Sequence, residues 1–337
     1  MRAAAALREG LRRVNRAPVV FAGMFAATLL VALPLSFVVR GTIAADLGDS
    51  LAAETAASGT NYDWWQEFSA RASGLGTTFV PSIIGFGAVL DNLGNLLDNA
   101  PMGAPVAGAI AVWMVVWSFL SGGVLDRYAR GRPTRAAGFF GACGAHFWRF
   151  LRLGVVAFAT YYVLFGWVHG WLFDELYERL TRNLTVERTA FAIRLGCYLL
   201  FGALLVAVNL VLDYARARIV VEDRRSALGA LVAAGRFVRR HPGALRLYLL
   251  NGGLFLVLIA AYALAAPGAA GPGWSMLLAL AAGELYILAR HYLKLLAYAS
   301  QVVFFQGALA HADYTAAPAL VWPDSPAAES IGNSSEL

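Results

Sequence analysis

Six long apolar runs restrict the fold of this chain more than any other feature of its sequence. Each run holds about 20 residues with almost no charge, enough for a helix to cross the roughly 30 Å hydrocarbon core of a bilayer. The runs cover 17–39, 104–123, 152–173, 190–212, 245–266 and 274–293. Apolar residues make up 59% of the chain and charged residues 14%, whereas soluble domains carry about 25% charged residues. The sequence therefore predicts an all-α integral membrane protein with six transmembrane helices and excludes a soluble globular protein.

The basic residues are sorted to one side of the membrane in this topology. The chain has 26 arginines and a single lysine, Lys294. With the N-terminus in the cytoplasm, 21 of these 27 residues fall in the N-terminal segment and the inner loops, as the positive-inside rule requires. Six spans then place both termini in the cytoplasm. The preference for arginine over lysine suggests a GC-rich bacterial genome, and we expect a multi-pass protein of the bacterial inner membrane.

The chain divides into three parts by composition. Residues 1–16 form a basic cytoplasmic segment, and the apolar run after it is too long for a signal peptide, so we interpret it as an uncleaved anchor. The polytopic domain is expected over 17–311. Residues 312–337 contain three prolines with several alanines and serines, a composition typical of a disordered tail.

The longest outer segment, 41–103, contains an amphipathic pattern between 79 and 98. Apolar residues recur there at helical spacing, with aspartates and asparagines between them: Phe79, Ile83, Phe86, Leu90, Leu93 and Leu97. This pattern favours an amphipathic helix on the outer membrane face. Pro81, Gly85 and Gly87 also permit a re-entrant segment that lines a cavity.

Two loops on the arginine-rich side resemble each other. The second apolar run ends in VLDRYAR at 124–130, and the fourth ends in VLDYAR at 211–216. Each is followed by basic residues and by a predicted short amphipathic helix, with Thr134 and Ser226 as the expected N-caps and with a break at His241-Pro242-Gly243 after the second. A parallel internal repeat would explain this likeness. The alternative is that both loops carry arginine because of the positive-inside rule and that the VLD sequence matches by chance.

We expect each aspartate of these motifs to pair with loop arginines at the depth of the lipid headgroups. The candidate headgroup or repeat residues are Asp126, Arg127, Arg130, Asp213, Arg216, Arg218, Arg239 and Arg240.

The segment DYARARIVVED at 213–223, followed by a helix that ends in GRFVRRHP at 235–242, resembles a loosely defined set of bacterial six-span proteins. The set includes the membrane domain fused to some glycerophosphodiester phosphodiesterases and its stand-alone relatives. The resemblance covers about 104–310 and implies a helical membrane domain. It carries no catalytic motif, and the soluble phosphodiesterase barrel does not occur in this sequence, so that activity is not implied.

Glu284 is the main ionisable candidate inside a span. His291 and Lys294 follow it by seven and ten positions and fall on the same helical face. A charged group inside the membrane is costly, so it favours a proton or cation relay or a contact to a polar substrate. The structural alternative is a buried pair with Arg194 or with a tyrosine.

Three further polar residues lie within the spans. His169 lies between Trp167 and Trp171 and fits either an interfacial histidine or a functional one. Asn209 and Asn251 are predicted to form hydrogen bonds between helices.

The sequence contains no catalytic motif and no metal-ligand spacing. Cys143 and Cys197 stand apart from each other and from any histidine pair, and we interpret them as small buried fillers with no cofactor role. Arginines beside membrane spans fit anionic headgroups better than nucleic acid. We therefore expect a non-enzymatic, lipid-associated scaffold or accessory subunit, with membrane lipids and other membrane proteins as partners. A transporter or channel with Glu284 in a polar cavity is the alternative, and an intramembrane lipid-modifying enzyme is the third.

Overall fold

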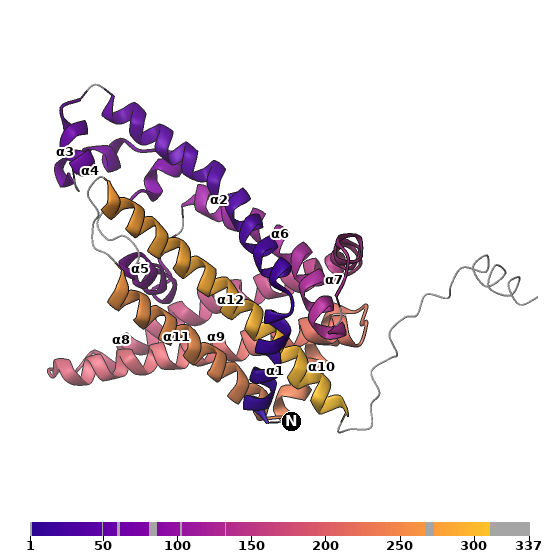
Figure 1. Cartoon of the computed structure of the whole chain (residues 1–337). Helices are drawn as coiled ribbons and strands as arrows, with labels where there is room; N and C mark the ends of the chain where they lie inside the picture. Colours follow the sequence, from indigo (N-terminus) through magenta and orange to yellow (C-terminus); the bar gives the residue numbers. More distant parts are fainter. Residues whose placement is uncertain are drawn as a thin grey trace, which may run out of the picture.

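The computed structural model describes residues 2–48, 50–58, 61–80, 86–101, 103–131, 133–266 and 273–310. These residues form helices and no strand (Figure 1). The predicted tail at 312–337 lies outside the described residues, as do Pro81, Ile83 and Gly85 of the outer segment.

Six helical segments are long and apolar enough to cross a membrane, which confirms the predicted all-α polytopic fold. Five of them are single helices: α2 (Pro18–Leu47), α6 (Ala104–Arg130), α9 (Glu187–Val221), α11 (Gly243–Ala265) and α12 (Trp274–Ala310). The sixth runs without interruption from α7 (Ala136–Val163) through two π-helical turns, η2 (Leu164–His169) and η3 (Trp171–Leu176), to α8 (Tyr177–Thr181).

Several helices extend beyond the apolar runs that predicted the spans. The helix expected at 274–293 extends to Ala310, the one at 17–39 extends to Leu47, and the one at 190–212 extends to Val221. The helices continue past the apolar runs because their polar ends pack against protein and need not lie in lipid. Gly131, in the left-handed region at φ 65°, ends α6, as glycine commonly does at a helix C-terminus.

The shorter helices are α1 (Ala3–Asn15), α3 (Ala52–Ser58), α4 (Tyr62–Arg71), the 3-10 turn η1 (Gly74–Thr78), α5 (Phe86–Leu97) and α10 (Ala227–Arg240). The predicted short helix of the second loop is α10, capped by Ser226, whose Oγ accepts a hydrogen bond from the Gly229 amide at 3.1 Å. The first loop differs from the prediction. Thr134 caps nothing there, and the segment expected as a separate amphipathic helix is the beginning of α7.

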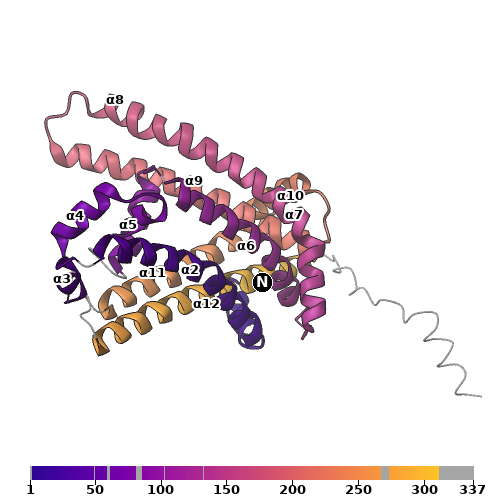
Figure 2. The ribbon, with the colours of Figure 1, turned by 90° about the horizontal axis from the view of Figure 1, so that it is seen from above.

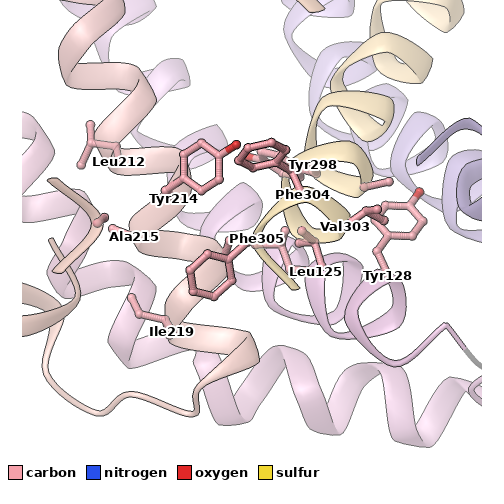
Figure 3. Close-up of a cluster of buried hydrophobic side chains, with 14 of the residues drawn as sticks. Leu125, Tyr128, Leu212, Tyr214, Ala215, Ile219, Tyr298, Val303, Phe304 and Phe305 are labelled. Atoms are coloured by element: carbon pink, nitrogen blue, oxygen red, sulfur yellow. The ribbon is translucent and has the colours of Figure 1, made fainter. Parts of the chain in front are cut away.

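A large core of buried side chains lies at one end of the molecule, which we call the arginine-rich end. In Figure 3, Tyr214 of α9 and Tyr128 of α6 lie on two sides of α12, beside Phe304 and Val303 respectively. Both tyrosines are fully buried. Burial of a large apolar side chain stabilises a fold by about 1.5–3 kcal/mol, so this core holds the helices together.

The helices separate toward the other end. Figure 2 shows the α7–α8 segment and α9 along one side, and α11 and α12 along the other. Helix α5 lies between the two pairs and contacts α11. Its C-terminal end is fixed to the opposite pair, where Asn99 Nδ2 donates to the Phe165 carbonyl at 3.1 Å and the Tyr198 hydroxyl donates to Asp98. The amphipathic segment therefore bridges the two sides through protein contacts.

Two close helix crossings depend on glycine. A Cβ on Gly123 of α6 would stand 2.6 Å from Cys143 Sγ of α7, and a Cβ on Gly10 of α1 would stand 2.7 Å from the Ser300 amide of α12. Small residues let helix backbones approach in this way. The Gly10 contact attaches α1 to α12, although the sequence suggested only a basic segment at 1–16.

Candidate functional site

The arginine-rich end is built from five separate parts of the chain, namely α1, α6, α7, the end of α9 and α12. Arg13 Nη1 of α1 donates to the Tyr128 carbonyl of α6 at 2.5 Å and to Gln306 Oε1 of α12 at 3.0 Å. Arg149 of α7 forms an ion pair with Asp223, just after α9. The arginines that the topology rule assigned to one side therefore converge in the fold.

A pocket of about 340 Å³ opens at this end, between the α1–α2 junction, α6 and the beginning of α7. We call it the Arg16 pocket. Its lining combines apolar side chains with two arginines at the border of the apolar spans: Arg16, Ala17, Pro18, Val19, Val20, Gly23, Met24, Leu120, Arg127, Pro133, Thr134, Ala136, Phe139 and Phe140.

The two arginines of the Arg16 pocket differ in their surroundings. Arg127 is 7% exposed, and its Nη2 donates to the Arg16 carbonyl at 3.3 Å, so it ties α6 to the α1–α2 junction. The Arg16 side chain is exposed and has no partner among the described residues. Arg127 therefore shapes the pocket, and the guanidinium of Arg16 is available to a ligand.

The two predicted aspartates pair with arginines on the next helical turn. Asp126 Oδ1 accepts from Arg130 Nε at 2.9 Å, and Asp213 Oδ1 accepts from Arg216 Nη1 at 2.9 Å. Asp213 Oδ2 also accepts from Gln301 Nε2 of α12 at 3.0 Å. The aspartates do pair with arginines, as predicted, but the partners belong to α6 and α9 themselves and not to the loops. Asp213 additionally joins α9 to α12.

Arg218 differs from Arg239 and Arg240 in its contacts within the protein. Arg218 Nη2 forms an ion pair with Glu222 at 2.7 Å, and its Nη1 donates to the Ala233 carbonyl of α10 at 2.6 Å. Arg239 and Arg240 are exposed in the last turn of α10 and have no partner in the described part of the chain.

Glu284, His291 and Lys294 do not form one site. His291 Nδ1 bonds to the Ile287 carbonyl at 2.8 Å, and its Nε2 lies 2.8 Å from Thr28 Oγ1 of α2. The Lys294 ammonium lies 3.5 Å from the centre of the Trp117 ring of α6, a cation–π contact. Three residues expected on one face therefore have different neighbours.

Glu284 has an unsatisfied buried oxygen. Its Oε2 has no hydrogen-bond partner among the described residues. The expected partner Arg194 instead donates to the Tyr198 hydroxyl at 3.4 Å on its own helix. The suggested pair between Glu284 and Arg194 is therefore wrong.

The other polar candidates are structural contacts between helices. The Tyr161 hydroxyl of α7 donates to Asn209 Oδ1 of α9 at 2.8 Å, and Asn251 Nδ2 of α11 donates to Ser300 Oγ of α12 at 3.2 Å, which confirms both predictions. His169 contacts protein groups. It is 8% exposed, stacks on Phe173 at 4.4 Å, and its Nε2 lies 2.8 Å from the Leu97 carbonyl of α5.

Sequence reasoning missed the lining of the Arg16 pocket. Phe139 and Phe140 fall in the segment expected as a separate amphipathic helix, and Gly23 lies within a uniformly apolar run. The position of Arg16, at the boundary between the basic segment and the first span, was the sequence feature that could have indicated this pocket. The two cysteines are buried and free, as fillers should be.

A comparison of this chain with known protein families, with curated proteins and with solved structures found no match.

Proposed function

We propose that this multi-pass membrane protein is non-enzymatic, binds anionic phospholipid at its arginine-rich end, and acts as a lipid-associated scaffold or accessory subunit of a membrane complex. The observation that carries the proposal is the Arg16 pocket, in which an apolar wall meets an exposed guanidinium at the border of the spans. By the positive-inside rule this border faces the cytoplasm.

A phospholipid has the two chemical characters that this pocket offers. Its acyl chain can pack against the apolar wall, which includes Val20, Met24 and Leu120, by van der Waals contact. Its anionic headgroup gains about 1 kcal/mol from each arginine near the membrane surface. Arg16 is placed to make that contact because its side chain is exposed and unpaired within the described residues.

Native mass spectrometry of the purified protein with anionic and zwitterionic lipids tests this function. Gly23→Leu should block the pocket, since a Cβ at Gly23 has no atom within 4 Å and the longer side chain can enter the space. Arg16→Gln should lower the occupancy by anionic lipid about five-fold, the equivalent of about 1 kcal/mol.

The matched controls are Gly41→Leu, at an equally open glycine of α2, and Arg8→Gln, at an exposed and unpaired arginine of α1. Both should bind lipid as the natural chain does. Equal lipid occupancy in all five proteins, or no preference for anionic lipid, would contradict the proposal.

A second candidate is a transporter, favoured by the buried Oε2 of Glu284, which has no hydrogen-bond partner in the part of the chain that the structure describes. A carboxylate held inside a bundle without a partner is costly unless a proton or cation occupies it during the cycle. Proton or cation flux into liposomes should then fall to background in Glu284→Gln and persist in Glu178→Gln, at an exposed site. Flux that is unchanged by Glu284→Gln, or absent from the natural protein, would exclude this candidate.

A further inference from the structure

A second pocket lies at the arginine-rich end, away from the Arg16 pocket. It has a volume of about 650 Å³ and is formed by the end of α9, by α10 and by the end of α12. We call it the Arg236 pocket. Its lining is Arg218, Arg224, Leu228, Gly229, Val232, Ala233, Arg236, Phe237, Arg240, His241, Ala308 and Leu309. None of these residues lines the Arg16 pocket.

The Arg236 pocket has an excess of positive charge. Four arginines line it, and Glu222 is the carboxylate that pairs with two of them, Arg218 and Arg224. Arg218 is further fixed by the Ala233 carbonyl and by the Phe305 ring, 5.3 Å from its guanidinium carbon. These two arginines are therefore held in place by the protein.

Arg236 and Arg240 remain without an ion-pair partner in the described part of the chain. They stand four positions apart on α10, so they are neighbours on one helix face and repel each other. An anion between them would remove this repulsion. Neighbouring arginines that the fold leaves uncompensated inside a concave surface are typical of an anion site.

Two general rules place arginine at this end of a membrane protein, but neither explains why four arginines line the Arg236 pocket. The positive-inside rule explains arginines beside spans, but it does not explain their convergence from α9 and α10 on one hollow. The helix dipole favours Arg239 and Arg240 in the last turn of α10, but it does not extend to Arg224 before the helix.

His241 adds a fixed imidazole to the wall. Its Nδ1 donates to the Phe237 carbonyl at 3.1 Å, and the ring stacks on Phe237 at 4.4 Å. The carbonyl can only accept, so Nδ1 carries a proton, and Nε2 has no partner among the described residues. Leu228 and Val232, 62% and 55% exposed, add an apolar surface beside these polar groups.

We infer that the Arg236 pocket binds a ligand that carries a phosphate monoester. Guanidinium groups match phosphate oxygens with paired, charge-assisted hydrogen bonds, and the volume lies in the range of small-molecule sites. Arg236 and Arg240 bind the phosphate, and the apolar wall takes the rest of the ligand. The ligand is either a water-soluble phosphate ester or a lipid with a monoester headgroup. This site is independent of the lipid site at the Arg16 pocket.

Calorimetric titration of the full-length protein in detergent with phenyl phosphate, a soluble phosphate monoester, and lipid binding by the protein in nanodiscs that contain phosphatidic acid test this inference at constant ionic strength. We expect saturable binding in at least one arm, weakened by Arg236→Gln with Arg240→Gln and not by Arg16→Gln. Binding of phenyl phosphate indicates a soluble ligand, and binding of phosphatidic acid alone indicates a lipid headgroup. Failure in both arms, or binding that depends on Arg16 instead, overturns the inference.

Arg236→Gln with Arg240→Gln should weaken the binding at least ten-fold. Arg239→Gln and Arg225→Gln remove the same charge from residues outside the lining and should leave the Kd within two-fold. Neither Arg236 nor Arg240 has a partner among the described residues, so both variants should keep the thermal unfolding temperature of the natural protein. Equal weakening by the control variants would show attraction to net charge and overturn the inference.

Discussion

The contacts of the carboxylates at the arginine-rich end were predictable from the sequence to different degrees. Asp126 and Asp213 stand in a recognisable motif that predicts pairing with loop arginines, but their partners Arg130 and Arg216 lie on the same helices as the aspartates. The bond from Gln301 to Asp213 joins residues 88 positions apart, and no spacing rule reaches that far. Glu222 attracted no notice, although it is the carboxylate that anchors Arg218 and Arg224.

Glu222 gives a prediction about acid stability. Burial opposes ionisation of its carboxyl, but the hydrogen bonds from Arg218 and Arg224 outweigh burial and hold the pKa below its ordinary value of 4.5. A carboxyl whose pKa is lowered by folding stabilises the protein above its unfolded pKa, and this stability is lost as the pH falls through the folded value. Glu222→Gln should therefore reduce the free energy of unfolding at pH 7, by about 1.5–3 kcal/mol for a charge-assisted bond.

Thermal unfolding of the natural protein and of Glu222→Gln between pH 3 and pH 7 checks this. The difference between the two should stay constant down to about pH 4.5 and shrink below it. Glu178→Gln, at an exposed residue, should match the natural protein throughout. A difference as large at pH 3 as at pH 7 would mean that the charge of Glu222 is not what stabilises the loop.

At the scale of helices, the existence of the six spans was predictable and their ends were not. A search for apolar runs stops at the first charges, so it ended the fourth span at 212 and the sixth at 293. Helix α9 continues because Arg216 and Arg218 find partners within the protein. Helix α12 continues because residues such as Leu295, Val302 and Phe305 are buried in the core.

Helix α1 shows the same limit of sequence reasoning. Five arginines in the first 16 residues indicated a basic segment, but Ala6 and Val14 are fully buried, and the Tyr292 hydroxyl of α12 donates to Asn15 at 2.6 Å. The partner surface on α12 lies almost 300 residues away in the sequence, and a local pattern cannot reveal it.

The position of α5 depends on a histidine that has a structural role. His169→Phe keeps the stacking on Phe173 and removes the hydrogen bond to the Leu97 carbonyl. One such bond contributes about 0.5–1.5 kcal/mol, so hydrogen–deuterium exchange over residues 86–101 should rise by roughly two- to ten-fold.

The matched control is His241→Phe, which removes a similar bond to the Phe237 carbonyl and keeps a similar stack at the arginine-rich end. It should leave the exchange of α5 unchanged. If both variants or neither raise the exchange at 86–101, His169 does not fix α5.

At the scale of the whole molecule, the end that carries the arginines of the inner loops is also the end where the main core lies. The arginine-rich end holds the main core and both pockets, and toward the other end the helices separate around α5 (Figure 2). The sequence could indicate which arginines share a side because topology follows from span count. It could not indicate which arginines line a pocket, because that depends on contacts among α1, α2, α6 and α7.

A photoreactive amino acid tests the proposed lipid site directly. Val19 lines the Arg16 pocket and is 82% exposed, whereas Leu30, 74% exposed, lies further along α2 and outside the pocket lining. Cross-linking from each position in native membranes, followed by identification of the attached lipid, measures the lipid composition at the two places.

We predict that the lipid attached at Val19 is enriched in anionic phospholipid relative to the bulk membrane, that the lipid at Leu30 matches the bulk, and that Gly23→Leu abolishes the enrichment at Val19. Lipid of bulk composition at both positions, or an enrichment that Gly23→Leu leaves intact, would contradict a lipid site at the Arg16 pocket.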